Sequence, residues 1–382
     1  MKILHTADWH LGRQFEGCSL EQDQAAALEQ VFTAITTHTP DVLIVAGDIF
    51  DRAVPPETSV RLFNGFLSRV ASETEAAIVL IAGNHDSGDR ISAWATLSDG
   101  RRSLVRGALS STELPLILED AHGPVAISAL PFGYERSAQE IFAISEIKCP
   151  EDVVRAQLAA ARTHIPDGAR WVVVAHAFVH GGNVSSCERP LSRLVGGIET
   201  VSADVFSGAH YVALGHLHKP QAVGADHIRY SGAPLAFTFE EETCAKSLSL
   251  VELGPDGRAR IELIPITPLR RVRTLRGTLA EILAQPPSED LIRPILTDPI
   301  RLVEHMKRIR ERFPNACALS YERDLIAAER RERPAGPAAA DAPAKVVSEF
   351  MTLVRGTAPS EAETEIVASY LADLEAPEEV AA

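Results

Sequence analysis

The chain begins with a repeated pattern in which a short apolar run ends in polar residues and a longer helical stretch follows. Uninterrupted apolar runs such as DVLIVA and WVVVA indicate strands buried on both faces. Helical spacing of apolar residues predicts a helix at Glu21–His38, and Pro55-Pro56 starts another that ends near Ser72. The predicted strands are Lys2–Thr6, Asp41–Ala46, Ile78–Ile81, Trp171–Ala175 and Tyr211–Leu214. This alternation predicts an α/β domain with its functional groups at the carboxyl ends of strands.

Less regular patterns between and after these runs predict the elements that complete the sheets. Helices are expected near Ser92–Asp99 and at Pro150–Thr163. Further strands are expected near Leu116–Leu118, Val125–Leu130, Ile228–Tyr230, Ser247–Leu253 and Arg260–Pro265. None of these segments carries a functional signal of its own.

The composition changes at Pro265 and Pro268, where a second pattern begins. A strand, a helix at Leu279–Ala284, a strand at Leu291–Thr297 and a helix at Leu302–Arg312 predict a small α+β module. The later stretch PAGPAAADAPA has the composition of a linker. The predicted division is a main domain over residues 1–268, the module over 269–333, the linker over 334–345 and C-terminal helices over 346–382.

The two predicted C-terminal helices, Val346–Leu353 and Glu361–Leu374, are richer in apolar residues than a free helix pair can leave in water. The apolar residues include Val347, Phe350, Met351, Val354, Ile366, Val367, Tyr370 and Leu371. Two ways of covering them are open at this point. The helices insert into a groove of a partner protein, or they pack back on the body of the chain.

Charge and cysteine usage limit the class of protein. The formal charge of −15 over 382 residues is not that of a general DNA-binding protein, although arginines and lysines crowd the stretch from Arg270 to Arg323. The 5 cysteines are scattered, with no CxxC pair, which indicates reduced thiols. Asp8 interrupts the N-terminus before a long apolar run develops, so we expect no signal peptide, no membrane span and a cytoplasmic location.

Polar residues of ligand type follow each of the five buried strands. Each group alone is equally well explained as a turn or, for His176, as a core histidine. Their joint occurrence at five strand ends favours a site, because independent turns rarely produce it. The residues are Asp8 and His10, then Asp48, then Asn84 with His85, then His176, and finally His216 with His218.

With His85 set aside, this set contains two carboxylates, one amide and four imidazoles. Oxygen and nitrogen ligands of this kind suit divalent manganese, iron or zinc, and the set has fewer carboxylates than a magnesium site prefers. Seven ligands exceed what one ion needs. Two ions about 3.5 to 4 Å apart would use all of them, and such pairs catalyse in-line displacement at phosphorus.

The chain contains five sequence motifs that, in this order, resemble those of the calcineurin-like metallophosphoesterase superfamily: DWHLG, GDIFDR, GNHDS, HAFVHGG and GHLHKPQ. The flanking words, including YSGAPLAFTFEE, resemble its SbcD-type nuclease branch. The resemblance implies a four-layer α/β fold, in which two packed mixed sheets are flanked by helices, with a small α+β capping domain and C-terminal helices. It covers about residues 1 to 265 well and the rest more loosely.

Transferred residue by residue, the resemblance implies two divalent ions, typically manganese, with magnesium a weaker substitute. Asp8, His10, Asp48 and His218 would hold one ion, and Asp48, Asn84, His176 and His216 the other. His85 would be the catalytic histidine that binds no metal, and Asp86 would orient its ring. Asp51 stands where archaeal and eukaryotic relatives have a histidine, so that histidine's role is not transferred.

The resemblance further implies a DNA phosphodiesterase with double-strand 3′ to 5′ exonuclease and single-strand endonuclease activity. Its expected partners are DNA and an SbcC-type coiled-coil ATPase, in a heterotetramer containing a homodimer of the nuclease subunit. Two alternatives are a small-molecule phosphodiesterase or phosphatase of the same superfamily and a non-catalytic scaffold. The small-molecule enzyme would leave the basic module and the apolar tail unused, and the scaffold is disfavoured because no ligand position is lost.

Overall fold

The computed structural model describes residues 1–95, 102–183, 193–194, 197–198, 200–325, 347–348, 350–352, 355 and 357–375. The chain divides into two compact units, Met1–Ser320 and Tyr321–Ala382. The predicted linker over 334–345 lies outside the described residues, as do parts of the first predicted C-terminal helix. The predicted domain boundary at residue 268 stays a prediction.

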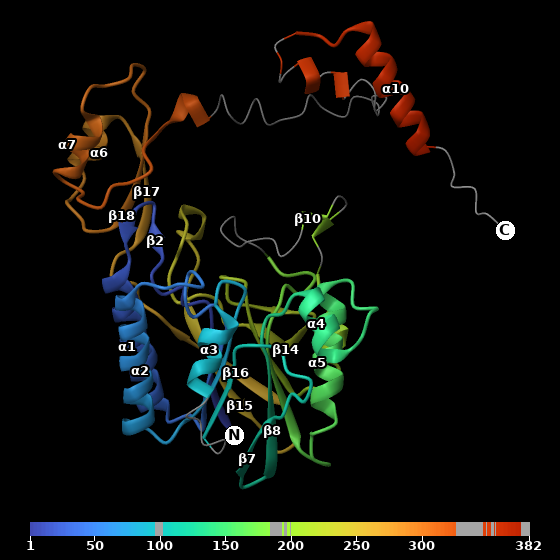
Figure 1. Cartoon of the computed structure of the whole chain (residues 1–382). Helices are drawn as coiled ribbons and strands as arrows, with labels where there is room; N and C mark the ends of the chain where they lie inside the picture. Colours follow the sequence, from blue (N-terminus) through green and yellow to red (C-terminus); the bar gives the residue numbers. More distant parts are fainter. Residues whose placement is uncertain are drawn as a thin grey trace. The chain divides into compact units, whose positions relative to one another are not determined.

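The first of two six-stranded mixed sheets, of which β15 and β16 are labelled in Figure 1, has the strand order β16-β15-β1-β4-β5-β6. Strands β1, β4, β5 and β6 pair in parallel, whereas β15 pairs antiparallel with both of its neighbours. The strands are β1 (Lys2–Thr6), β4 (Val42–Ala46), β5 (Ala77–Ile81), β6 (Ser103–Arg106), β15 (Ser247–Leu253) and β16 (Ala259–Pro265).

The second sheet has the order β13-β14-β12-β9-β8-β7. Its four inner strands pair in parallel, and the two edge strands pair antiparallel with their neighbours. The strands are β7 (Leu116–Asp120), β8 (Gly123–Leu130), β9 (Arg170–His176), β12 (Tyr211–Gly215), β13 (Gln221–Val223) and β14 (Ala225–Tyr230).

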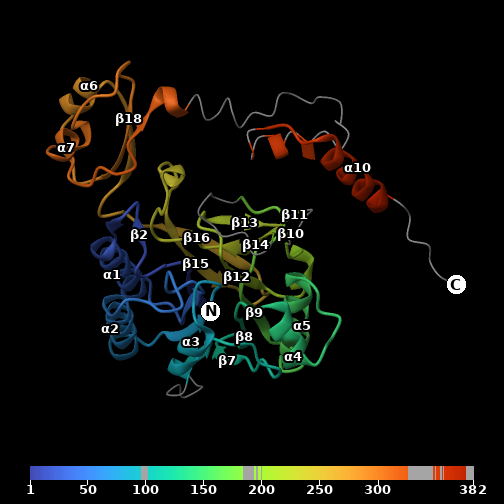
Figure 2. The same cartoon turned by 45° about the horizontal axis from the view of Figure 1, so that its top comes forward.

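The two sheets pack face to face, and helices cover their outer faces. Side chains alternate along a strand, so Ile44 of β4 lies in the core between the sheets, together with Val172 of β9, while Leu43 faces the helices. Every residue of β4 and β9 is therefore buried, as their apolar runs predict. This four-layer α/β arrangement, with α1 and α2 on one side of the strands and α4 and α5 on the other in Figure 2, confirms the predicted fold class.

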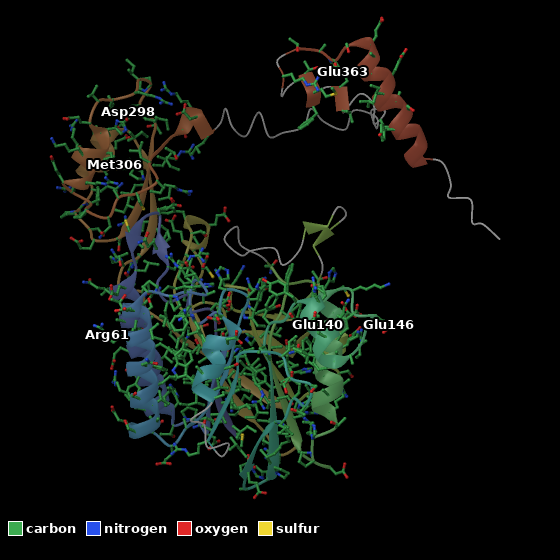
Figure 3. All side chains as sticks on the ribbon, in the orientation of Figure 1. Arg61, Glu140, Glu146, Asp298, Met306 and Glu363 are labelled. Carbon is green, nitrogen blue, oxygen red and sulfur yellow. The ribbon has the colours of Figure 1, made fainter. Side chains whose placement is uncertain are left out.

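Five helices form the outer layers of this unit. Helices α1 (Glu21–His38), α2 (Glu57–Glu73) and α3 (Gly88–Ala95) pack on the first sheet, and α5 (Pro150–Arg162) packs on the second with α4 (Glu135–Phe142) against it. Arg61, labelled in Figure 3, lies on the exposed side of α2. Among the described residues, no helix combines the length and apolar character needed to cross a membrane.

The remaining described elements lie outside the two large sheets and the five helices that cover them. Residues after Pro268 form a small sheet of order β17-β18-β19 with two helices, in agreement with the predicted α+β pattern. Its elements are β17 (Val272–Gly277), α6 (Leu279–Ala284), β18 (Leu291–Leu296), α7 (His305–Arg310) and β19 (Ser320–Tyr321). Elsewhere lie β2 (Gln14–Phe15), β3 (Cys18–Ser19), β10 (Arg193–Leu194), β11 (Gly197–Ile198), η1 (Ala203–Phe206), η2 (Phe239–Glu241) and, in the second unit, α10 (Glu361–Glu375).

Several elements depart from the sequence expectations. The sequence pattern does not predict β6 or α4, because each buries few residues: Leu104 and Val105 in β6, and Ala138 in α4. Helix α3 begins at Gly88, four residues before the predicted start at Ser92. Helix α7 is shorter at both ends than the predicted Leu302–Arg312.

Candidate metal centre

The carboxyl ends of strands from both sheets meet at one site. Backbone bonds hold the loops after β1 and β4 together, since Asp8 N donates to Gly47 O and His10 N donates to Asp48 O, both at 3.0 Å. Contacts across the sheets bring all seven predicted metal ligands into one cluster. From the first sheet come Asp8, His10, Asp48 and Asn84, and from the second come His176, His216 and His218.

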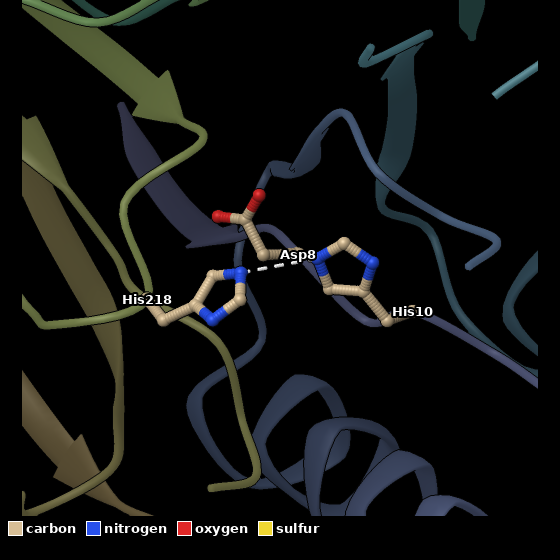
Figure 4. A group of neighbouring side chains, drawn as sticks. All are labelled: Asp8, His10 and His218. Atoms are coloured by element: carbon tan, nitrogen blue, oxygen red, sulfur yellow. Dashed lines mark hydrogen bonds between the residues drawn. The ribbon is translucent and has the colours of Figure 1, made fainter. Parts of the chain in front are cut away.

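Asp8, His10 and His218 form the first half of this cluster (Figure 4). The Nε2 atoms of His10 and His218 lie 3.1 Å apart. One ligand atom from each of the three residues lies within 4.8 Å of the others, and all three residues are buried. The Asp8 carboxylate also accepts the backbone N–H of His216, at 2.9 Å from Oδ1. This contact joins the loop after β1 to the loop after β12, which carries His218 of the first half and His216 of the second.

The second half is built around the side-chain oxygen of Asn84. Asn84 Oδ1 lies 3.0 Å from His176 Nε2 and 3.2 Å from His216 Nδ1. Asp48 lies between the halves, because its Oδ2 atom is 3.6 Å from the Nε2 atoms of both His10 and His176. A carboxylate in that position can serve two ions at once.

The lone pairs in the second half fit a cation. His176 Nδ1 donates its N–H to the Ala46 carbonyl at 2.9 Å. Burial lowers the pKa of His176, so the ring is neutral and Nε2 carries a lone pair. That lone pair faces the acceptor oxygen of Asn84. Two acceptors at this distance repel each other unless a positive ion lies beside them, so these residues fit a divalent metal.

Two other buried imidazoles, those of His10 and His216, are also in the metal-binding protonation state. Burial lowers the pKa values of His10 and His216 well below 6.5, and the neighbouring histidine rings lower them further. A neutral ring offers a nitrogen lone pair without first losing a proton. The cluster can therefore hold divalent cations at neutral pH.

Four of the seven residues have an unusual backbone conformation. Their φ angles are positive, at 54° for Asp8, 44° for His10, 48° for Asp48 and 112° for His216. Residues other than glycine adopt such angles at a cost that the surrounding structure must offset, and such strain is concentrated at functional sites. The strain turns each side chain sharply out of its strand and toward the cluster.

Gly83 is required by the closeness of two strand ends. A Cβ atom at this position would overlap the carboxylate of Asp48. The glycine therefore lets the loop after β5 approach the loop after β4, and His85 N can donate to Asp48 Oδ1 at 2.9 Å.

His85 lies at the edge of the cluster and is partly exposed. Its Nδ1 atom donates to the backbone carbonyl of Asp51 at 2.8 Å. Its ring centroid is 4.8 Å from that of His10, and His10, Asp51 and His85 also form a group whose ligand atoms lie within 4.8 Å. The bond to Asp51 fixes the ring and leaves Nε2 directed away from that carbonyl.

Asp86 makes contacts other than the predicted one with the ring of His85. Its two oxygens accept N–H groups of Ile49, Phe50 and Gly83, at 3.0, 2.9 and 2.9 Å. Within the described part of the chain no hydrogen bond joins Asp86 to His85, so the Asp51 carbonyl orients the ring instead. Burial and the nearby charge of Asp48 raise the pKa of Asp86 to about 7, although the hydrogen bonds from these three backbone donors act to lower it. Asp86 thus joins the loop after β4 to the loop after β5 through backbone donors from both.

Sequence reasoning did not assign three residues that support the ligands. Gln24 Nε2 donates to the backbone carbonyl of His10 at 2.8 Å. Glu241 and Lys246 contact His218, and both are buried. Burial raises the pKa of Glu241, but the contacts with His218 and Lys246 outweigh it and lower this pKa to about 2. Glu241 is the last residue of the segment YSGAPLAFTFEE, and the resemblance of that segment to the family was the signal that could have identified it. His180, four residues beyond His176, is exposed.

Comparison with known proteins agrees with this geometry. Residues 1–220 match the family model described as calcineurin-like phosphoesterase. The chain is 30% identical over 326 residues to a protein of Staphylococcus saprophyticus subsp. saprophyticus that is named as the SbcD subunit of the nuclease SbcCD. The match covers 84% of this chain and 85% of that protein.

Proposed function

The chain belongs to the calcineurin-like phosphoesterase family, and on that premise we propose that it is a two-metal DNA phosphodiesterase. The observation that carries the proposal is the position of Asp48, whose Oδ2 atom is 3.6 Å from a histidine nitrogen in each half of the cluster. A shared carboxylate between two ligand groups is the arrangement that two-metal phosphodiester hydrolysis needs. The similarity to a nuclease subunit over most of both chains supports DNA as the substrate.

In this proposal each half of the cluster holds one ion. Asp8, His10, Asp48 and His218 hold one, and Asp48, Asn84, His176 and His216 hold the other. Divalent cations bound there, preferably manganese and less well magnesium, supply a water of lowered pKa and neutralise charge on a phosphoryl group. Gln24 and Lys246 fix the backbone carbonyls of His10 and His218, so the ligands are already positioned.

His85 acts on the leaving group in this proposal. The Asp51 carbonyl holds its Nδ1–H, so the ring presents Nε2 beside the ligand cluster. Because it is partly exposed, the ring can exchange protons with water. We assign it one of two roles: it gives a proton to the departing oxygen, or it stabilises the negative charge on that oxygen.

The rest of the chain contains the regions that bind the partners of the proposed nuclease. The α+β module after Pro268, with Arg271, Arg273 and Arg276, guides DNA, since arginines bind phosphate groups. The C-terminal helices bind an SbcC-type coiled-coil ATPase, which makes cutting ATP-dependent. The complex contains two nuclease subunits and acts at double-strand ends and hairpins in DNA repair, recombination and replication. Its activities are double-strand 3′ to 5′ exonuclease and single-strand endonuclease.

The test uses the metal-stripped full chain, manganese and an end-labelled DNA hairpin, with and without the coiled-coil ATPase and ATP. We expect cleavage that requires manganese and that Asp48→Asn abolishes. The matched control is His180→Ala, because His180 is exposed and contributes nothing to the cluster. Absence of cleavage with partner and ATP present would refute the proposal. Hydrolysis of a cyclic nucleotide far faster than DNA would favour the small-molecule phosphodiesterase.

A further inference from the structure

His218 is supported from behind by two buried charged side chains, Glu241 and Lys246. Glu241 Oε1 lies 3.6 Å from His218 Nδ1, within ion-pairing range. Lys246 Nζ donates to the backbone carbonyl of His218 at 3.0 Å and also to Glu241 Oε2. Glu241 is 5% exposed and Lys246 is 7% exposed. The ring and the backbone of His218 are thus each contacted by one member of a buried ion pair.

Stability alone does not explain this pair. Removing two charges from water costs free energy that their mutual attraction seldom exceeds, and apolar pairs of similar volume are often as stable. Both side chains also contact His218, Glu241 at the ring and Lys246 at the backbone carbonyl. The geometry therefore indicates a role at this histidine.

A carboxylate beside Nδ1 has a defined effect on an imidazole. It favours the tautomer with the proton on Nδ1, and so places the lone pair on Nε2. The Nε2 atom of His218 is the atom that lies 3.1 Å from His10 Nε2, in the half of the cluster that contains Asp8 (Figure 4). The negative charge also raises the electron density of the ring, which strengthens it as a ligand.

The other half of the cluster has a different support. His176 Nδ1 is held by a neutral acceptor, the Ala46 carbonyl. A charged support behind His218 and a neutral one behind His176 make the two halves electrostatically unequal. A change at Glu241 should therefore act on one half and spare the other.

We propose that Glu241, held in place by Lys246, is a positioning residue that orients His218 and sets the metal affinity of the Asp8–His10–His218 half. The inference rests on the proposed two-metal site and adds that the two ions are bound with unequal support. Glu241 touches neither metal nor substrate in this role and acts through the ring of His218.

The segment that carries Glu241 also contacts the α+β module. Glu242 Oε2 accepts the backbone N–H of Thr274 in β17 at 3.0 Å. The guanidinium of Arg293 lies 4.8 Å from the centroid of the Phe239 ring. Glu242 is exposed and adjoins Glu241, so it offers a matched control for the same chemical change one residue away.

The experiment measures manganese binding to the metal-stripped full chain by the loss of the free-ion electron paramagnetic resonance signal. We expect two sites in the wild type. In Glu241→Gln one of them should weaken about 10- to 100-fold while the other keeps its affinity. Glu242→Gln should bind both ions as the wild type does. The double variant Glu241→Gln/Lys246→Met leaves no unpaired buried charge and should show the same selective loss in a folded protein.

The outcomes separate this inference from the proposed function. Two manganese sites without DNA cleavage would refute the nuclease and still allow the role of Glu241 to be measured. Wild-type affinity at both sites in the folded double variant would overturn the positioning role, as would equal weakening of both sites. A wild type that binds no manganese would overturn both proposals.

Discussion

His176 Nδ1 donates a hydrogen bond of 2.9 Å to the carbonyl oxygen of Ala46, and this bond joins the ends of β9 and β4 across the two sheets. It fixes the tautomer of the ring, so that Nε2 faces Asn84 Oδ1 and Asp48 Oδ2. One contact between sheets thus determines both the position of a proposed ligand and the nitrogen that it offers.

His176→Ala should therefore remove one of the two manganese ions. Hydrolysis of a small phosphodiester should fall by about 100- to 1,000-fold, on the scale of losing one group that stabilises a transition state. Metal stoichiometry and steady-state kinetics measure the two effects. His164→Ala, a change at an exposed histidine, is the control. Two ions bound with wild-type affinity in His176→Ala would contradict the ligand assignment.

His85→Ala should lower the rate of hydrolysis without removing a metal ion. Because the ring is held by the Asp51 carbonyl and is assigned to proton transfer, its loss should lower the hydrolysis rate by roughly 100- to 10,000-fold. Manganese affinity should stay unchanged, since His85 is not a proposed ligand. A titration of the variant with manganese, run beside the rate measurement, checks this. Weaker manganese binding would mean that His85 coordinates metal directly.

The metal-stripped protein should lose stability in mild acid because of buried neutral histidines. Burial lowers the pKa of His5, which contacts Tyr211, from 6.5 to about 3. Below about pH 6.5 the unfolded chain gains a proton at His5 that the folded chain does not, so the stabilisation present at higher pH is lost as pH falls toward 3.

Comparison with His5→Leu isolates this effect. Between about pH 6 and pH 4, the free energy of unfolding of the wild type should fall, relative to the variant, by about 1.4 kcal/mol per pH unit. Urea unfolding of both proteins after metal removal measures it. A difference that does not change with pH would show that His5 does not titrate abnormally.

Two glycine-to-alanine changes should have opposite effects. In Gly83→Ala the new methyl group meets the Asp48 carboxylate, so manganese binding should weaken and the protein should be destabilised. Gly65 lies in α2, and a Cβ atom added there would have no atom within 4 Å, so Gly65→Ala should raise the free energy of unfolding by about 0.5 to 1 kcal/mol. Thermal unfolding and manganese titration distinguish them. Unchanged metal binding in Gly83→Ala would argue against the closeness of the two loops.

The C-terminal helices should be needed for partner binding and not for hydrolysis. Ile366 and Tyr370, 59% and 70% exposed, are four residues apart and lie on one side of α10. Deletion after Pro334, or Ile366→Glu/Tyr370→Glu, should abolish co-purification with the SbcC-type ATPase and leave manganese-dependent cleavage of a small phosphodiester intact. Glu365→Gln on the same helix is the control. Co-purification of the truncated chain would contradict the assignment.

The sequence predicted most of the central strands because a strand buried on both faces is an uninterrupted run of apolar residues. The run at Val42–Ala46 is apolar throughout, that at Arg170–His176 is apolar between its two end residues, and the structure buries every residue of both. Helix α4 escaped prediction because it buries Ala138 alone, and a single buried residue produces no period. The residue types at the strand ends likewise identified the candidate ligands before any contact was known.

By itself, the sequence determined which strands exist and which polar residues follow them, because both are properties of neighbouring residues. Only the tertiary structure decided that His10 and His218 face each other at 3.1 Å, that Asp48 lies between the halves, and that Asp86 binds backbone amides rather than His85. It also placed Glu241 behind His218. These contacts depend on how two sheets pack against each other, and the hydrophobic periodicity along the chain contains no information about that packing.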